Sequence, residues 1–129
     1  MTVVFVHGVP ESAAIWGPLV AELGRDDVVL LSPPGFGAEL PADFPATHAA
    51  YREWLAGELA QFSEPVDLVG HDWGGGHALN VAANHPELLR SWVSDVLGVF
   101  DPEYVWHDLA QVWQTPDAAA MLRRGEHQP

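Results

Sequence analysis

The sequence predicts an α/β fold, in which a mostly parallel β-sheet carries helices on both faces. Two observations predict it. Short runs of β-branched and other apolar residues recur along residues 1–98, which is the pattern of strands buried in a parallel sheet. Segments with apolar residues at helical spacing separate these runs. Strands that alternate with helices in this way favour right-handed crossovers between parallel strands.

Four apolar runs are the predicted strands: residues 2–6, 28–31, 66–69 and 92–97. The first is continuously apolar and should be buried on both faces. Glycine, proline or polar residues follow each run and end it. Ligands of such a sheet bind outside the carboxyl ends of its strands. Four polar residues of this sequence should lie there: His7, Ser32, Asp72 and Asp95.

Three helices are predicted between the strands, over residues 18–23, 47–62 and 73–85, and residues 12–16 are predicted to be loop. Pro18 suits the first turn of the first helix, and Gly24 fits its C-terminal cap. Thr47 can cap the second helix, whose apolar residues recur at helical spacing. These helices would cover the sheet and bury its apolar side chains.

The character of the chain changes beyond Gly98. Asp101-Pro102 is a good helix start, and an aromatic-rich helix should run from there to Trp113. Thr115-Pro116 should start another helix. The predicted domains are therefore a core over residues 1–98, helices over residues 99–125 and a tail over residues 126–129.

Composition excludes several classes of partner. The chain has 129 residues, of which 48% are hydrophobic, and a formal net charge of -13. A surface of this charge repels phosphates and anionic membranes, so neither nucleic acid nor a membrane is an expected partner. No run is apolar and long enough to span a bilayer, and the start has no secretory pattern. We expect a cytoplasmic protein of one domain at most.

The most informative stretch is a glycine-rich turn over residues 70–76, Gly-His-Asp-Trp-Gly-Gly-Gly, which joins the third strand to the third helix. Its form is G-x-D-x-G, the pattern of a nucleophile elbow with an aspartate at the apex. Asp72 would lie at a helix N-terminus, where negative charge is favoured. The alternative is that Asp72 simply caps the helix.

Two other uses of this turn are disfavoured. A phosphate loop would include a lysine, which this run lacks, and Asp72 would repel the phosphate. A metal site built from His71, Asp72 and His77 would crowd three ligands into one turn at no known spacing. We therefore expect no metal and no cofactor.

Three motifs follow three successive strands in a fixed order: His7-Gly8-Val9-Pro10, Pro34-Gly35-Phe36-Gly37 and the turn that contains Asp72. Together they resemble the N-terminal half of an α/β-hydrolase. The resemblance is to the aspartate-nucleophile branch, which includes epoxide hydrolases and haloalkane dehalogenases. Residues 99–125 would then resemble the start of the cap that covers the pocket in that family.

The resemblance implies that Asp72 is the nucleophile and that the backbone N–H groups of Val9 and Trp73 form the oxyanion hole. A carboxylate that attacks a saturated carbon gives an alkyl ester, which water can then hydrolyse, whereas attack on an ester would give an anhydride. The implied substrate is a small apolar epoxide or haloalkane. Val9 stands where one dehalogenase group has a halide-binding asparagine, which favours the epoxide. His7 either orients this loop or contributes to substrate binding.

The other members of a catalytic triad are harder to find. Asp95 is a candidate acid and Tyr104 a candidate cap donor, while Ser32 stands where many relatives have an aspartate. His71 is expected to be a packed or hydrogen-bonded neighbour of Asp72. Another βα unit needs about 30 residues, so a catalytic histidine after the last strand of the full fold is not expected within this chain.

This chain should therefore capture its substrate on Asp72 and release the product slowly or not at all. The alternative from another class is a non-catalytic fragment that assembles with a second copy or with a missing C-terminal half. A sheet that ends after the fourth strand would leave an edge open for such association.

Overall fold

The computed structural model describes residues 1–95, 98 and 101–113. The chain divides into two compact units, Met1–Leu97 and Gly98–Pro129. Within the described residues, no helix is both long and apolar enough to cross a membrane.

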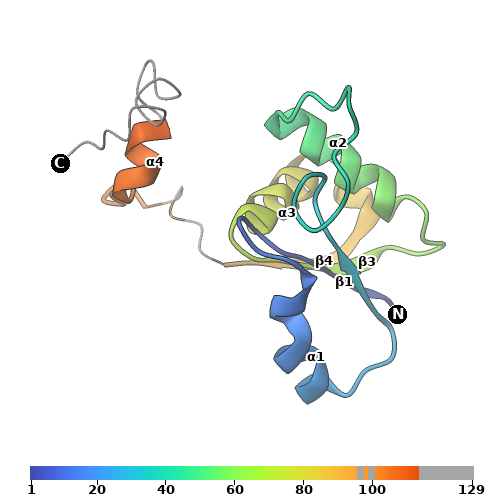
Figure 1. Cartoon of the computed structure of the whole chain (residues 1–129). Helices are drawn as coiled ribbons and strands as arrows, with labels where there is room; N and C mark the ends of the chain where they lie inside the picture. The colour runs from blue at the N-terminus through green and yellow to red at the C-terminus, as the bar shows by residue number, and fades with distance from the viewer. Residues whose placement is uncertain (96–97, 99–100, 114–129) are drawn as a thin grey trace. The chain divides into compact units, whose positions relative to one another are not determined.

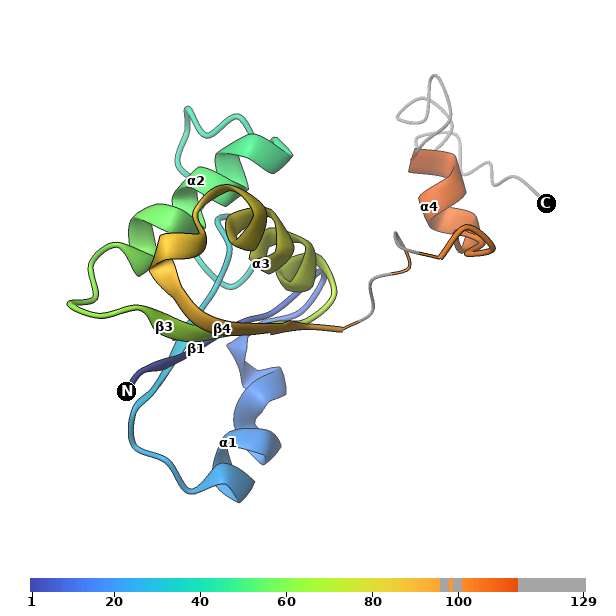
Figure 2. The same cartoon turned by 180° about the vertical axis from the view of Figure 1, so that it is seen from behind.

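The first unit is built on a four-stranded parallel sheet with the strand order β2-β1-β3-β4. Its strands are β1 (Val3–Val6), β2 (Val28–Leu31), β3 (Val66–Gly70) and β4 (Leu89–Ser94). Figure 1 shows α1 (Gly17–Leu23) on one face of the sheet, with α2 (His48–Leu59) and α3 (Trp73–Asn84) on the other. The view from behind shows the same two layers (Figure 2). The predicted fold class is confirmed.

The core lies on both faces of β1, as its continuously apolar sequence predicts. On one face Val4 and Val6 join a buried cluster with side chains from β3, α2 and α3. On the other face Val3 and Phe5 pack against Trp16. The outer strands β2 and β4 are less buried than β1, because each has a paired neighbour on one side only within the described sheet. Residues 28–31 form the predicted strand, but the expectation that this strand is buried was wrong.

The predicted start of α2 and the predicted end of α1 are confirmed, whereas α2 ends at Leu59 and not at residue 62 as predicted. Thr47 Oγ1 accepts from the N–H of Ala50 at 3.1 Å at the start of α2. Gly24 ends α1 with φ 60°, the left-handed conformation that glycine adopts without strain. The predicted loop before α1 was wrong: Ala13–Trp16 is a short 3-10 helix, η1, and the Ser12 hydroxyl caps it by accepting from Ala14.

Strand β4 begins three residues earlier than the sequence predicts. Arg90 and Ser91 look unlike strand residues in sequence, but both bond to the carboxylate of Asp67 on β3. A cross-strand partner of opposite charge makes these polar positions favourable in a strand. Residues 96–97, the end of the predicted strand, lie outside the described residues.

In the second unit the first predicted helix is shorter than expected, because α4 spans only Asp108–Trp113. The Asp101 carboxylate accepts from the N–H of Glu103 at 2.9 Å and closes a single turn instead of starting a helix. The α4 helix is capped later, where His107 Nδ1 accepts from the N–H of Ala110 at 3.1 Å. The helix predicted after Thr115 and the predicted tail 126–129 lie outside the described residues.

Candidate active site

The turn between β3 and α3 has the geometry of a nucleophile elbow. Asp72 has φ 56° and ψ -126°, a backbone conformation that residues with a side chain rarely adopt. A Cβ atom on Gly70 would overlap the carbonyl of Gly74, and a Cβ on Gly74 would overlap the carbonyls of Val6 and His7. The two glycines of G-x-D-x-G are therefore required by the close approach of α3 to β3 and β1.

The Asp72 carboxylate does not cap α3. The Asp72 side chain makes no capping hydrogen bond to the helix, while its backbone carbonyl accepts from Gly75 and Gly76 at 2.9 and 3.2 Å. Instead, Oδ2 accepts from the N–H of Val9 at 3.2 Å. The carboxylate is thus held toward the loop after β1, beside one of the two N–H groups predicted for the oxyanion hole.

The strained backbone of Asp72 gives a testable consequence. We expect Asp72→Gly to be more stable to unfolding than Asp72→Ala by about 1 kcal/mol, because only glycine adopts this conformation without strain. Both variants lose the carboxylate and its bond to Val9, so the difference between them isolates the backbone. Urea unfolding followed by far-UV circular dichroism measures it. An alanine variant as stable as the glycine variant would contradict a strained elbow.

His7 fixes the loop that carries Val9. The side chain is fully buried, and Nδ1–H donates to the carbonyl of Gly8 at 2.8 Å. Because a carbonyl oxygen only accepts, Nδ1 carries a proton, and Nε2 lies within hydrogen-bond distance of the Ser32 hydroxyl oxygen, at 2.9 Å. Nδ1 thus bonds within the loop after β1, and Nε2 joins this loop to Ser32, just after β2. Ser32 thus takes part in the same loop contact.

His71 lies between two carboxylates on the other side of the elbow. Its Nδ1 is 2.7 Å from Asp95 Oδ1, and its Nε2 is 3.6 Å from Glu11 Oε2. Partial burial lowers the pKa of His71, but the hydrogen bond to Asp95 and the negative charges of Asp95, Glu11 and Asp72 outweigh burial and raise this pKa overall. The structure therefore joins the candidate acid Asp95 to a histidine, and this histidine precedes Asp72 directly in the chain.

Aromatic rings from α2 and α3 pack against one another next to the elbow. Trp73 is 39% exposed and stacks on His48, with ring centroids 5.4 Å apart. Tyr51 stacks on His77 at 4.8 Å and donates from its hydroxyl to the carbonyl of Pro34 at 2.8 Å. Tyr51 thus connects α2 to the proline-rich loop after β2, and the indole of Trp73, which follows Asp72 directly in the chain, remains exposed.

Glu11 and His48 had no predicted role, and His77 was considered only as a disfavoured metal ligand. Glu11 could have been found, because it follows Val9-Pro10 in the loop at the carboxyl end of β1. No signal in the helical pattern distinguishes His48 or His77 from an ordinary helix residue. Tyr104 belongs to the second unit, where its ring packs edge-on against Trp106 at 5.2 Å.

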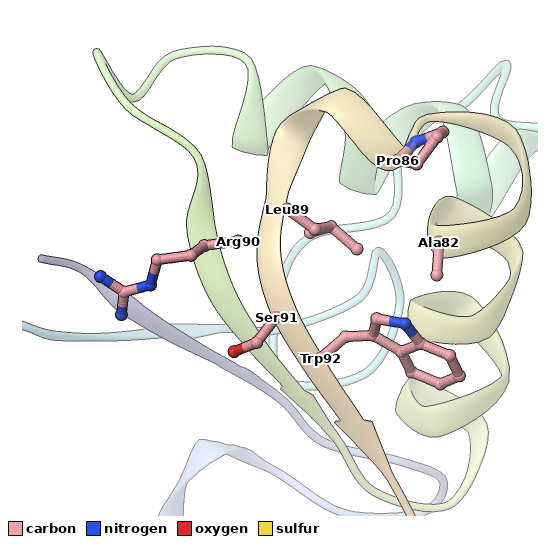
Figure 3. Close-up of a pocket in the computed structure, with 6 residues that line it drawn as sticks. All are labelled: Ala82, Pro86, Leu89, Arg90, Ser91 and Trp92. Atoms are coloured by element: carbon pink, nitrogen blue, oxygen red, sulfur yellow. The ribbon is translucent and has the colours of Figure 1, made fainter.

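Neither a metal cluster nor the hollow beside β4 adds to the site at Asp72. In the part of the chain that the structure describes, no group of three or more His, Cys, Asp or Glu side chains could hold a metal. A hollow beside β4 is lined by Ala82, Pro86, Leu89, Arg90, Ser91 and Trp92 (Figure 3). It adjoins the C-terminal part of α3 and the start of β4, whereas Asp72 lies at the N-terminal end of α3.

Comparison with known proteins gives a consistent family match. Residues 2–121 match the family model described as alpha/beta hydrolase fold. The AB hydrolase superfamily protein YfhM of Bacillus subtilis (strain 168) is 26% identical over 142 residues, covering 97% of this chain and 49% of that protein. A 2-hydroxymuconate semialdehyde hydrolase of Pseudomonas sp. (strain CF600) is 34% identical over 115 residues, covering 86% of this chain and 40% of that enzyme.

Among solved structures, a haloalkane dehalogenase loop variant from Bradyrhizobium elkanii is similar with a TM-score of 0.65. Its identity is 22%, and the match covers 96% of this chain and 47% of the dehalogenase. At this identity the similarity bears on the fold alone. The chain spans less than half the length of both curated relatives and of this structure.

Proposed function

This chain belongs to the α/β-hydrolase fold family, and from that premise we propose that it carries the nucleophile of an epoxide hydrolase, with Asp72 forming an alkyl ester with a small apolar epoxide. The observation that carries the proposal is the state of the Asp72 carboxylate. Asp72 lies at the apex of a strained strand-to-helix turn. Its carboxylate makes no capping hydrogen bond to α3 and accepts instead from the N–H of Val9.

The type of nucleophile sets the type of substrate. Asp72 attacks a saturated carbon of the epoxide, a C–O bond of the strained ring breaks, and the released alkoxide takes a proton from a donor or from water. The product of this step is an ester between Asp72 and a hydroxyalkyl group.

The aromatic residue next to Asp72 suits a substrate without charge. The exposed face of Trp73 offers apolar contact area directly beside the nucleophile, and aromatic faces bind apolar groups through buried area. The chain's strongly negative charge disfavours anionic substrates. A neutral epoxide with an aryl or alkyl substituent meets both conditions.

Trapping the ester tests the proposal. We expect the chain, incubated with styrene oxide and quenched in acid, to gain the mass of one epoxide on the peptide that contains Asp72. Asp72→Asn should lose this adduct, while the matched control Asp101→Asn in the second unit should keep it. Peptide mass spectrometry locates the adduct.

The same experiment includes the competing substrate class. With 1-bromobutane in place of the epoxide, an Asp72 adduct accompanied by faster bromide release would identify a haloalkane dehalogenase instead. A folded wild-type chain that gives no adduct with either compound, or one that labels equally in Asp72→Asn, would show that Asp72 is not the nucleophile.

A further inference from the structure

Imidazole rings from two helices contact the indole of Trp73, the residue that follows Asp72. The ring of His48 stacks on this indole, with 17° between the ring planes and 5.4 Å between the centroids. Two nearly parallel rings at this centroid distance are offset and not fully overlaid. His48 therefore covers only part of one indole face, and Trp73 remains 39% exposed.

The second imidazole holds the indole from the core. His77 lies one turn further along α3, is buried, and contacts the Trp73 ring at a centroid distance of 6.4 Å. Tyr51 stacks on His77 at 4.8 Å and donates to the carbonyl of Pro34 at 2.8 Å, which ties His77 to α2 and to the loop after β2. The indole thus rests on a fixed partner, whereas His48 contacts it from the protein surface.

The backbone under His48 is also fixed. His48 is the first residue of α2 and follows Thr47, whose hydroxyl caps the helix by accepting from the N–H of Ala50. An imidazole turns about only two side-chain bonds, so a capped backbone leaves it few orientations. We therefore expect the His48 ring to limit the rotation of the Trp73 indole about its own side-chain bonds.

We propose that His48 is a positioning residue that, through Trp73, gives the site at Asp72 a preference for aryl epoxides over alkyl epoxides. This inference rests on the proposed function of Asp72 and names its substrate class more closely. An aryl ring gains from an offset or edge-to-face contact only while the partner ring keeps its orientation. An alkyl group gains from buried area alone and depends less on that orientation.

The charge of the rings supports the same preference. Burial, and to a smaller extent the positive charge of His48, lower the pKa of His77 to about 4. At pH 7 the core partner of the indole is therefore a neutral ring. The chain's negative charge disfavours anionic aryl compounds, which leaves a neutral aryl epoxide as the ligand that fits.

The test compares two epoxides that have the same number of carbon atoms, styrene oxide and 1,2-epoxyoctane. The chain is incubated with increasing concentrations of each, and formation of the Asp72 adduct is followed by peptide mass spectrometry. In His48→Ala we expect the concentration of styrene oxide that gives half the maximal labelling rate to rise about fivefold, the effect of one aromatic contact. The maximal rate, and the half-maximal concentration of 1,2-epoxyoctane, should stay close to the wild-type values.

Further substitutions separate ring stacking from a general structural role. His48→Phe keeps a ring and should restore the preference for styrene oxide, whereas His48→Gln is polar without a ring and should behave like His48→Ala. His85→Ala removes an imidazole at the opposite end of α3 and should match wild type. The tryptophan band in near-ultraviolet circular dichroism should change in the alanine and glutamine variants and stay closer to wild type in His48→Phe.

The outcomes distinguish this inference from the proposed nucleophile. Equal half-maximal concentrations of the two epoxides in wild type, or equal effects of His48→Ala on both, overturn His48 as the source of selectivity and leave Asp72 as the nucleophile. A His48→Phe chain that behaves like His48→Ala overturns stacking as the cause. Absence of any adduct in the folded wild-type chain overturns the proposed function and this inference with it. If His48→Ala does not fold, His48→Gln provides the same comparison.

Discussion

Replacing Gly74 with alanine is expected to lower the free energy of unfolding by about 3 kcal/mol. The new methyl group would overlap the carbonyl groups of Val6 and His7 at the end of the central strand β1. Backbone atoms inside a paired sheet cannot move aside as a flexible side chain can, so α3 would have to lift from the sheet. Chemical denaturation followed by circular dichroism measures the loss.

Gly76 provides a matched control in the same helix. A Cβ at Gly76 would meet no other atom within 4 Å. Gly76→Ala should therefore stabilise the chain by about 0.5–1 kcal/mol, because alanine loses less backbone entropy than glycine on joining a helix. Equal effects of the two substitutions would mean that helix propensity, not contact with β1, decides the choice of glycine at Gly74.

The second large effect concerns acid pH. Burial, and to a smaller extent the positive charge of the nearby His48, lower the pKa of His77 from 6.5 to about 4. Between these two pH values the unfolded chain binds a proton at His77 that the folded chain does not bind, so stability falls as the pH falls. His77 alone should reduce the free energy of unfolding by about 3 kcal/mol between pH 7 and pH 4.

A variant that cannot titrate isolates this contribution. In His77→Gln the loss of stability between pH 7 and pH 4 should be smaller than in wild type by that same amount, because the carboxylates that titrate in this range are common to both proteins. Denaturation curves at several pH values supply the comparison. Parallel pH profiles for the two proteins would show that His77 is protonated as readily in the folded chain as in the unfolded one.

Much of the architecture could be predicted from local sequence, because apolar periodicity and capping residues report directly on burial and helix ends. The continuous run before His7 marked the central strand, and Thr47 marked the start of α2. The start of β4 could not be predicted, because Arg90 and Ser91 are stabilised by Asp67, more than twenty residues earlier in the chain. Local patterns do not contain such cross-strand pairs.

The candidate site also has a part that local sequence predicts and a part that depends on contacts between strands. The position of Asp72 at the end of β3 followed from the glycines around it, whose small size is needed locally. The partners of Asp72 and His71 come from other strands: Val9 follows β1 and Asp95 follows β4. Sequence could place Asp95 near the right edge of the sheet, but only the parallel order of the strands brings it to His71. Glu11, in the loop after β1, likewise reaches His71 only because the two strands are neighbours in the sheet.

The contact of Gly74 with the carbonyls of β1 has a consequence for motion. Elements at the centre of a sheet open only when the whole domain unfolds, whereas surface loops open locally and often. Since α3 begins at Trp73 and rests directly on β1, Asp72 should share the slow amide exchange of the central strands. The proposed nucleophile would then be held in position before any substrate binds.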